Sequence, residues 1–509
     1  MAAAAVVAVV LLVNALLPAE VPATPYGRVV NTACRVDQVS LIRMARGYRP
    51  GRAGDIEMVP SEPNLVAAPG GRLTHEGPFT NLQHIPLFLL GQGYIRRGRT
   101  VLRGVRAAAI APTIASLLDF ESRSWLPEEA PLAEGIRVAR PDQPPKLILT
   151  LVWEGIGRNV LAKWPNSWPD LEHLVNNGTW YEKASAGTSP SAAAPVQATI
   201  GTAVYPRTHG IVGDSYRIGG RIVPAYSRGP SDLLVPTLAD VYDRERGGRP
   251  LVGLIGSDIA GLGLLGHGAS FPGGDRDLMA HHPRTGRGAR WSLPHTPWEH
   301  DFELPKGLDH FSGLKGRFDT PAGADYETSA LEKIIRTQGF GRDDVSDLLF
   351  ANYSMGDSVA ERFGMGSPQM RDVVAGLDHQ LFRLRTFLNK TVGMHQWVMI
   401  LTADHGSTPN PAVVGSFVID PTALQADLQR RFGGGKGHPS VVTGMGATQI
   451  WLNMPLLNKR GFTAYDVSRY LLDYTAGDNR GPNVEGADQR VFQAAFPTKL
   501  LPNLPCLGS

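Results

Sequence analysis

The stretch that most constrains the fold of this chain is Trp397–Gly406, which ends in Ala403-Asp404-His405-Gly406. Its apolar run, Trp397–Leu401, has the composition of a strand buried on both faces of a parallel sheet. In open α/β sheets, ligands bind just beyond the carboxyl ends of the strands. An Asp-His pair there, followed by a Gly that lets the backbone turn, could ligate a metal ion. Taken alone, the same pair is more typical of a turn and a helix cap.

Two other apolar runs also end next to acidic residues. Residues 147–153, LILTLVW, precede Glu154 and a Gly, and residues 347–353, DLLFANY, precede a segment that contains Asp357 and Glu361. Glu154 is therefore a second candidate ligand, although a helix N-cap region explains it equally well in isolation. Residues 369–389 have apolar side chains at helical spacing and predict an amphipathic helix.

Composition limits the possible functions more than it specifies one. With 509 residues, 42% of them hydrophobic, the chain can form one large α/β domain or two smaller ones. A net charge of +3 gives no indication of a nucleic-acid partner. The two cysteines, Cys34 and Cys506, have no zinc-finger spacing and are either two free thiols or one disulfide.

The N-terminus is almost wholly apolar up to about Pro18, and its first basic residue is Arg28. A signal peptide or a short membrane anchor over residues 1–24 both fit this pattern, and a buried core helix is the alternative. Either of the first two interpretations predicts an exported protein, extracytoplasmic or membrane-anchored, with membrane association through the N-terminus as one possibility.

The rest of the chain divides into segments of different character. Strands are expected near 54–60 and 85–90 and a helix over 107–118, whereas His75, in a Gly/Pro-rich loop, has the pattern of a surface histidine when taken alone. Residues 126–146 are Pro-rich and polar without period, which predicts a linker. Residues 260–325 are rich in Gly, His and Pro and predict an insertion that covers a site.

Residues 185–214 combine a loop rich in small and hydroxyl side chains with a helical stretch and the turn Tyr205-Pro206-Arg207-Thr208-His209-Gly210. Such a segment can present a hydroxyl nucleophile at a helix N-terminus, where backbone N–H groups stabilise an anion. A simple capped helix is the other interpretation.

The order of these motifs over roughly 147–410 resembles the type I phosphodiesterase/nucleotide pyrophosphatase branch of the alkaline phosphatase superfamily. The resemblance implies an α/β/α sandwich with a central, mostly parallel sheet. It also implies a metal-dependent hydrolase of phosphate esters or phosphodiesters that acts on a small-molecule phosphate ester. Two divalent metal ions would clamp the attacking and leaving oxygens of an in-line displacement.

The N-terminal segment resembles the piece that comes last in that family. The matching stretches are THEGPF at 74–79, HIPLFLLGQGYIRRG at 84–98 and AIAPTIASLLDF at 109–120. The resemblance therefore implies a circularly permuted chain, in which residues 25–125 are the C-terminal part of the catalytic fold and residues 147–509 are its main part. Permutation is tolerated where termini lie close together, which would favour a disulfide between the two cysteines.

The resemblance also assigns the site residues by position. One metal site would comprise Glu154, Asp404 and His405, and the other would comprise Asp357, Glu361 and His75. Asp214 stands where the family often has an Asn that contacts the phosphoryl oxygen.

Besides Asp214, three residues depart from the family pattern. Glu154 replaces an Asp, and Glu361 replaces a His, which would shift the metal preference from zinc toward a harder ion such as manganese, magnesium or calcium. Ala193 stands at the position of the nucleophilic Thr or Ser. Ser191 is the nearest hydroxyl that could replace it, and Thr188 and Ser189 are others. The sequence therefore supports two hypotheses: an active hydrolase, or a catalytically inactive pseudoenzyme that binds a metal or anionic ligand.

Overall fold

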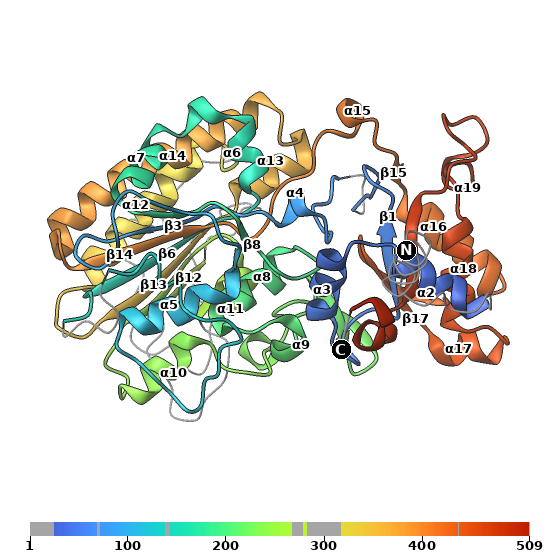
Figure 1. Cartoon of the computed structure of the whole chain (residues 1–509), viewed down its shortest axis with the longest axis horizontal. Coiled ribbons are helices and arrows are strands. Elements are labelled where there is room, and N and C mark those ends of the chain that lie inside the picture. The colour runs from blue at the N-terminus through green and yellow to red at the C-terminus, as the bar shows by residue number, and fades with distance from the viewer. Residues whose placement is uncertain are drawn as a thin grey trace, which may run out of the picture.

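The computed structural model describes residues 25–68, 72–137, 143–266, 278–281, 317–435 and 437–507, so the predicted signal peptide or anchor lies outside the described residues. Its main sheet has eight strands (Figure 1). In spatial order they are β12 (Leu278–His281), β11 (Val252–Gly256), β13 (Asp347–Tyr353), β6 (Leu147–Trp153), β14 (Trp397–Thr402), β3 (Leu87–Leu90), β7 (Thr179–Tyr181) and β4 (Arg99–Val101). The first five are mutually parallel, and β3 joins β14 antiparallel.

The register of the central strands brings the predicted site residues to one edge of the sheet. Trp153 pairs with Tyr353 across β6 and β13, and Val152 pairs with Thr402 across β6 and β14. Because parallel strands end at the same edge, the residues that follow them meet there. The strands predicted at 147–153, 347–353 and 397–401 are confirmed, and β6, β13 and β14 are wholly buried.

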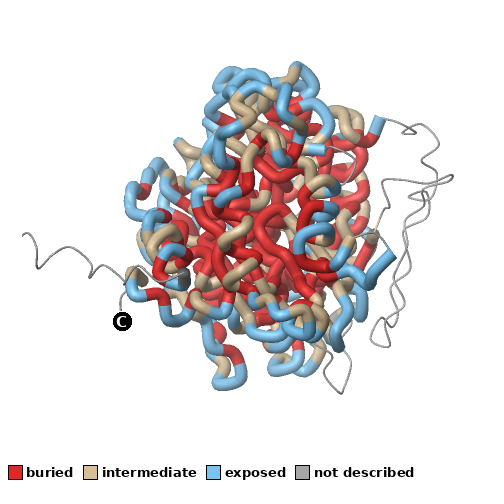
Figure 2. The backbone as a smooth tube through the Cα atoms, turned by 90° about the vertical axis from the view of Figure 1, so that its right-hand side faces the viewer, coloured by how far each residue is buried: buried red, intermediate tan, exposed pale blue. Residues whose placement is uncertain are grey.

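Helices cover both faces of the main sheet, which confirms the predicted α/β/α sandwich (Figure 1). One face packs against α6 (Arg158–Lys163), α7 (Pro169–Asn177), α12 (Pro321–Gln338), α13 (Met355–Phe363) and α14 (Pro368–Leu388). The other packs against α5 (Ile110–Leu117), α8 (Ala193–Thr202), α10 (Leu238–Glu245) and α11 (Ile259–Gly266). Figure 2 shows the buried segments gathered in the interior.

Local sequence explains the longest of these helices. α14 begins after Ser367, whose side chain accepts the Met370 N–H, and Pro368 occupies the first turn, where no N–H is needed. Its buried side chains, including Val373, Leu377 and Leu381, recur at helical spacing and face the sheet. The helix predicted over 369–389 is thereby confirmed.

A second, antiparallel sheet lies beside the main one. Its order is β16 (Val442–Met445), β17 (Gln449–Leu452), β1 (Ile56–Pro60) and β18 (Phe492–Pro497). α2 (Pro25–Ala33), α16 (Pro421–Phe432) and α18 (Ala464–Asp473) complete a core of their own with this sheet. The N-terminal segment thus supplies β1 to the second sheet and β3 to the main sheet.

The two cysteines form a disulfide, Cys34–Cys506, which resolves the alternatives left by the sequence. Disulfides persist in oxidising compartments, so this bond indicates a location outside the cytoplasm.

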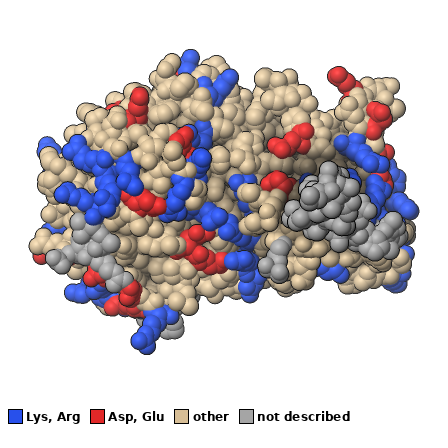
Figure 3. Space-filling model, in the orientation of Figure 1, with Lys and Arg blue, Asp and Glu red and all other residues tan. Residues whose placement is uncertain are grey.

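Among the residues that the structure describes, no helix is both long and apolar enough to cross a membrane. Basic and acidic side chains are interspersed on the face shown in Figure 3.

The connecting segments are more closely packed than their composition suggested. Within the predicted linker, Leu132 is buried and its N–H donates to Thr113 Oγ1 of α5 at 2.9 Å. Within the predicted insertion at 260–325, most of α11 and all of β12 belong to the layers of the main domain, and 267–277 and 282–316 lie outside the described residues.

Candidate active site

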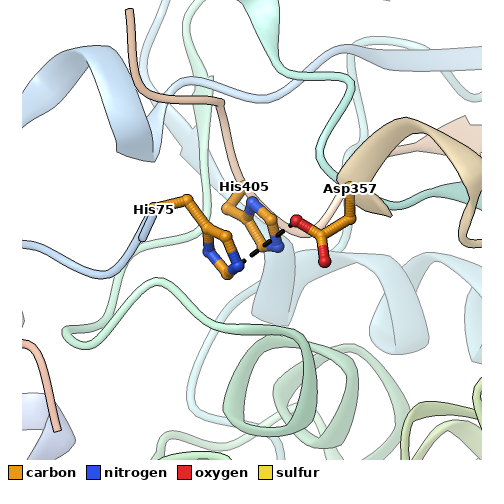
Figure 4. A group of neighbouring side chains, drawn as sticks. All are labelled: His75, Asp357 and His405. Carbon is orange, nitrogen blue, oxygen red and sulfur yellow. Dashed lines mark ion pairs between the residues drawn. The ribbon is translucent and has the colours of Figure 1, made fainter. Parts of the chain in front are cut away.

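Three side chains from distant parts of the chain converge at the carboxyl edge of the main sheet (Figure 4). His405 follows β14, Asp357 lies in the first turn of α13, and His75 comes from the loop before α4 (Thr80–Gln83). One nitrogen or oxygen from each lies within 4.8 Å of the others. This group is called the His75 cluster below.

The hydrogen bonds of the His75 cluster leave its inner atoms available to a cation. His405 Nδ1 lies 3.0 Å from the Gly406 carbonyl, which orients the ring, and the buried His405 Nε2 has no hydrogen-bond partner. Asp357 Oδ1 also has no hydrogen-bond partner and lies 3.3 Å from His75 Nε2. The other nitrogen of His75 lies 3.2 Å from the Ser191 carbonyl. Two imidazoles, each oriented by a backbone carbonyl, together with a carboxylate fit a divalent cation.

The charges around the cluster favour a positive ion. The two imidazole rings stack with their centroids 3.6 Å apart. Burial alone would lower the pKa of His75, but the negative charges of Asp357, Asp214 and Glu76 outweigh it and raise that pKa to about 9. The surroundings thus stabilise a positive charge at this point.

Glu154 and Asp404, expected in a metal site with His405, share a side chain that the sequence analysis did not single out, while Asp404 Oδ1 also lies 3.4 Å from His405 Nε2. Gln197 Nε2 donates to Glu154 Oε1 at 2.8 Å and to Asp404 Oδ2 at 3.2 Å. Asp404 Oδ1 accepts the backbone N–H groups of Gly155 at 3.1 Å and His405 at 2.9 Å. Both carboxylates of this second set thus have hydrogen-bond partners within the protein. The assignment of Glu154, Asp404 and His405 as ligands of one ion stays a prediction.

The carboxyl pair is also kept away from water. Glu154 is 3% exposed and Asp404 is 0% exposed. Burial and the nearby Asp258 and Asp404 raise the pKa of Glu154 well above its usual range. Gln197 lies four residues after Ala193, one turn along α8 on the same side of the helix, and that spacing was the only sequence signal that could have pointed to it.

Glu361 is not brought into the His75 cluster. Its carboxylate forms an ion pair with Arg72 at 2.9 Å, and the Leu73 N–H donates to its backbone carbonyl at 3.4 Å. The assignment of Glu361 as a ligand stays a prediction, and it would require the side chain to leave Arg72.

Asp214 lies at the N-terminus of α8, where the resemblance places a phosphoryl contact. Its Oδ1 accepts the Ala194 N–H at 3.0 Å. The residue is exposed to an open cavity, and partial desolvation by the neighbouring protein raises the pKa of Asp214 above its usual value.

Ser191 is fully buried, and its hydroxyl lies within donating distance of the backbone carbonyls of His75 at 3.1 Å and Gly77 at 3.0 Å. These contacts hold the loop that carries His75. Ala193 is the first residue of α8 and offers no hydroxyl. Ser191 as the nucleophile therefore stays a prediction that requires the hydroxyl to give up its carbonyl partners.

A cavity of about 520 Å³ opens beside the His75 cluster, between the main domain and the second sheet. Its described lining residues carry no basic side chain, and they include Glu76, Asp214, Ile222, Met445 and Trp451. The Ala447 N–H donates to Glu76 at 3.2 Å, and burial raises the pKa of Glu76 to about 7. The cavity is apolar over much of its wall and acidic where it meets the cluster.

Comparison with known structures identifies the class of fold. A crystal structure of the alkaline phosphatase PafA is similar with a TM-score of 0.50 and 17% sequence identity, covering 67% of this chain and 78% of that one. The protein thus has an alkaline-phosphatase-like α/β fold. A sequence model of the type I phosphodiesterase / nucleotide pyrophosphatase family matches residues 148–481, and the chain belongs to this family.

Curated relatives match shorter stretches. Alkaline phosphatase PafA of Elizabethkingia meningoseptica is 25% identical over 189 residues, which is 36% of this chain and 32% of the relative. Alkaline phosphatase PhoV of Synechococcus elongatus is 31% identical over 91 residues, which is 18% of this chain and 16% of the relative. The chain thus spans a third or less of the length of the curated relatives that it matches.

Proposed function

We propose that this protein is a metal-dependent hydrolase of phosphate esters or phosphodiesters. The observation that carries the proposal is the His75 cluster, in which His405 Nε2 and Asp357 Oδ1 are buried without hydrogen-bond partners at the carboxyl edge of the sheet. Buried polar atoms without partners are costly unless a ligand satisfies them. Membership of a family named for phosphodiesterases and pyrophosphatases gives the reaction class.

His75, Asp357 and His405 would hold the ion. A bound divalent ion polarises a phosphoryl oxygen and lowers the pKa of water. Two imidazoles with one carboxylate suit zinc, and manganese is the alternative among the harder ions. The Gly406 and Ser191 carbonyls would keep both rings oriented for binding.

The acidic cavity would receive the organic group of a small-molecule ester. Ile222, Met445 and Trp451 offer apolar contact, whereas Glu76 and Asp214 would disfavour further phosphate groups close to the cluster. We therefore propose a compact ester with one phosphoryl group rather than a polyphosphate.

A second candidate, a pseudoenzyme that binds a metal or anionic ligand, is favoured by Ala193, which offers no hydroxyl at the first position of α8, and by Ser191, whose hydroxyl faces two carbonyl groups. The hydroxyls of Thr188 and Ser189, in the loop before α8, have no hydrogen-bond partner and are the other candidates for a nucleophile. The two candidates predict the same metal binding and differ only in turnover.

The test is hydrolysis of p-nitrophenyl phosphate and bis(p-nitrophenyl) phosphate by protein loaded with zinc or with manganese. We expect turnover that His405→Ala abolishes and that His173→Ala, at an exposed position on α7, leaves unchanged. Metal binding without turnover of either ester would contradict the hydrolase and support the pseudoenzyme. Activity that survives His405→Ala would contradict the site.

We further infer that the chain is a circular permutant that is exported, with a cleaved or membrane-associated N-terminus. The insertion of β3 beside β14 and the donation of His75 to the cluster support the permutation. A variant with residues 25–125 moved behind residue 507 should keep its fold and its metal binding. Loss of both in a soluble variant would contradict the permutation, and recovery of the native chain from the cytoplasm with free thiols would contradict export.

A further inference from the structure

The geometry points to a site for one cation, with the side-chain amide of Gln197 in the place of a second ion between Glu154 and Asp404. The inference deepens the proposed function and rests on metal binding at the His75 cluster, but it does not depend on turnover. It departs from the two-ion site that the resemblance implies.

The two carboxylates have hydrogen-bond donors within the protein. A primary amide carries two N–H donors, and Gln197 Nε2 directs them to Glu154 Oε1 and Asp404 Oδ2, at 2.8 and 3.2 Å. The second oxygen of Asp404 accepts two backbone N–H groups. A cation at this position would have to displace the amide from both carboxylates, whereas a cation at the His75 cluster displaces no hydrogen bond of His405 Nε2 or Asp357 Oδ1.

The side-chain amide of Gln197 is held in place by its neighbours. Gln197 is fully buried, and Asn352 Nδ2 lies 3.5 Å from its Oε1 while also donating to the Asp258 carbonyl at 3.1 Å. On the other side, α11 passes so close that a Cβ placed on Gly261 would lie 2.4 Å from Gln197 Oε1. The side chain is thus confined between β13 and α11 with its NH₂ group facing the two carboxylates.

The start of α8 offers no hydroxyl that could serve a second ion. Ala193, the first residue of the helix that carries Gln197, stands where the family resemblance places the nucleophilic hydroxyl. Neither a ligand nor a nucleophile is available from that position. The replacement of the hydroxyl and the occupation of the carboxylate pair by Gln197 therefore fit together as features of a site with one ion.

The experiment measures metal stoichiometry by elemental analysis and by calorimetric titration with zinc and with manganese on the full chain. We expect one ion per chain in the native protein and none in His405→Ala. Glu154→Gln should retain one ion, because this carboxylate holds the amide and not the ion. Gln197→Ala should bind more than one ion, because it frees two buried carboxylates, whereas the matched control Gln380→Ala, a buried glutamine on α14, should remain at one.

Two ions in the native protein, or loss of the ion in a folded Glu154→Gln variant, would overturn the inference. A folded Gln197→Ala variant that still binds one ion would overturn the role of the amide, and no ion in the native protein would overturn both the inference and the proposed site. One ion without hydrolysis of any ester would contradict only the proposed function, so the two failures are distinguishable.

Discussion

The histidine of the Tyr205–Gly210 turn, His209, should make the stability of this protein fall in acid. It is fully buried beneath α8, where its Nδ1 accepts the Ile211 N–H and its Nε2 lies 3.1 Å from Thr199 Oγ1. Burial, with a smaller effect of the Arg52 charge, lowers the pKa of His209 from 6.5 to about 3. The ring therefore stays neutral in the folded protein at any pH at which the protein is ordinarily handled.

The sign of the effect follows from proton binding. The unfolded chain protonates this imidazole near pH 6.5 and the folded chain near pH 3, so between these values the unfolded state binds more protons and the free energy of unfolding falls with falling pH. One pKa unit corresponds to about 1.4 kcal/mol. Lowering the pH from 7.5 to 4.5 therefore reduces the free energy of unfolding by about 2.6 kcal/mol through His209 alone.

The assay compares the native chain with His209→Asn by urea unfolding at pH 7.5, 6.5, 5.5 and 4.5. Asn places an oxygen near the position of Nδ1, so it can still accept the Ile211 N–H, but it does not titrate. All other titrating groups are shared by the two proteins, so their contributions cancel in the stability difference. The stability difference between them should shrink by about 2.6 kcal/mol over this range. A difference that stays constant with pH would refute the argument.

Three further predictions concern the cavity, the disulfide and a helix start. Above about pH 8, where Glu76 with its pKa of about 7 is ionised, Glu76→Gln should lower KM for an anionic diester roughly threefold, because it removes one negative charge near the substrate; steady-state kinetics showing an unchanged or higher KM would contradict the placement of the substrate. Cys34→Ser should cost about 2–5 kcal/mol of stability by breaking the bond to Cys506, measured by denaturant unfolding, and equal stability with and without the bond would contradict this. Asp378→Ala should cost about 1–2 kcal/mol, because it removes the acceptor of the Leu171 N–H at the start of α7, and an unshifted thermal midpoint would show that water replaces it.

The sequence predicts the strands and helices whose signals are local patterns of apolar residues. β6 and β13 have the predicted bounds to the residue, and α14 differs from its predicted range by one residue at each end, because apolar runs and helical spacing are properties of adjacent residues. The sequence also predicts that side chains following three of these strands lie at one edge of the sheet, because each one follows a recognisable apolar run. The family resemblance added His75, which its own loop did not distinguish.

The details of the site could not be predicted, because they depend on contacts between distant residues. Gln197 meets Glu154 and Asp404 at separations of 43 and 207 residues, and Arg72 reaches Glu361 across 289. Neither polar pairing leaves a periodic pattern in the sequence. Two contacts were therefore not expected: His405 stacks on His75, and the amide of Gln197 lies between Glu154 and Asp404, while Asp404 also lies 3.4 Å from His405 as the predicted grouping requires.

The position of β1 has a consequence for how the chain acquires its structure during synthesis. β1 lies between β17 and β18, and β3 lies beside β14, so strands made within the first hundred residues wait for partners made some three to four hundred residues later. Neither sheet can be completed until most of the polypeptide exists, and pairings of such long range are slow to form. β3 can pair early with β7, but β1 and Cys34 must wait for β17, β18 and Cys506. Protection of the apolar β1 segment by a chaperone in that interval would limit aggregation.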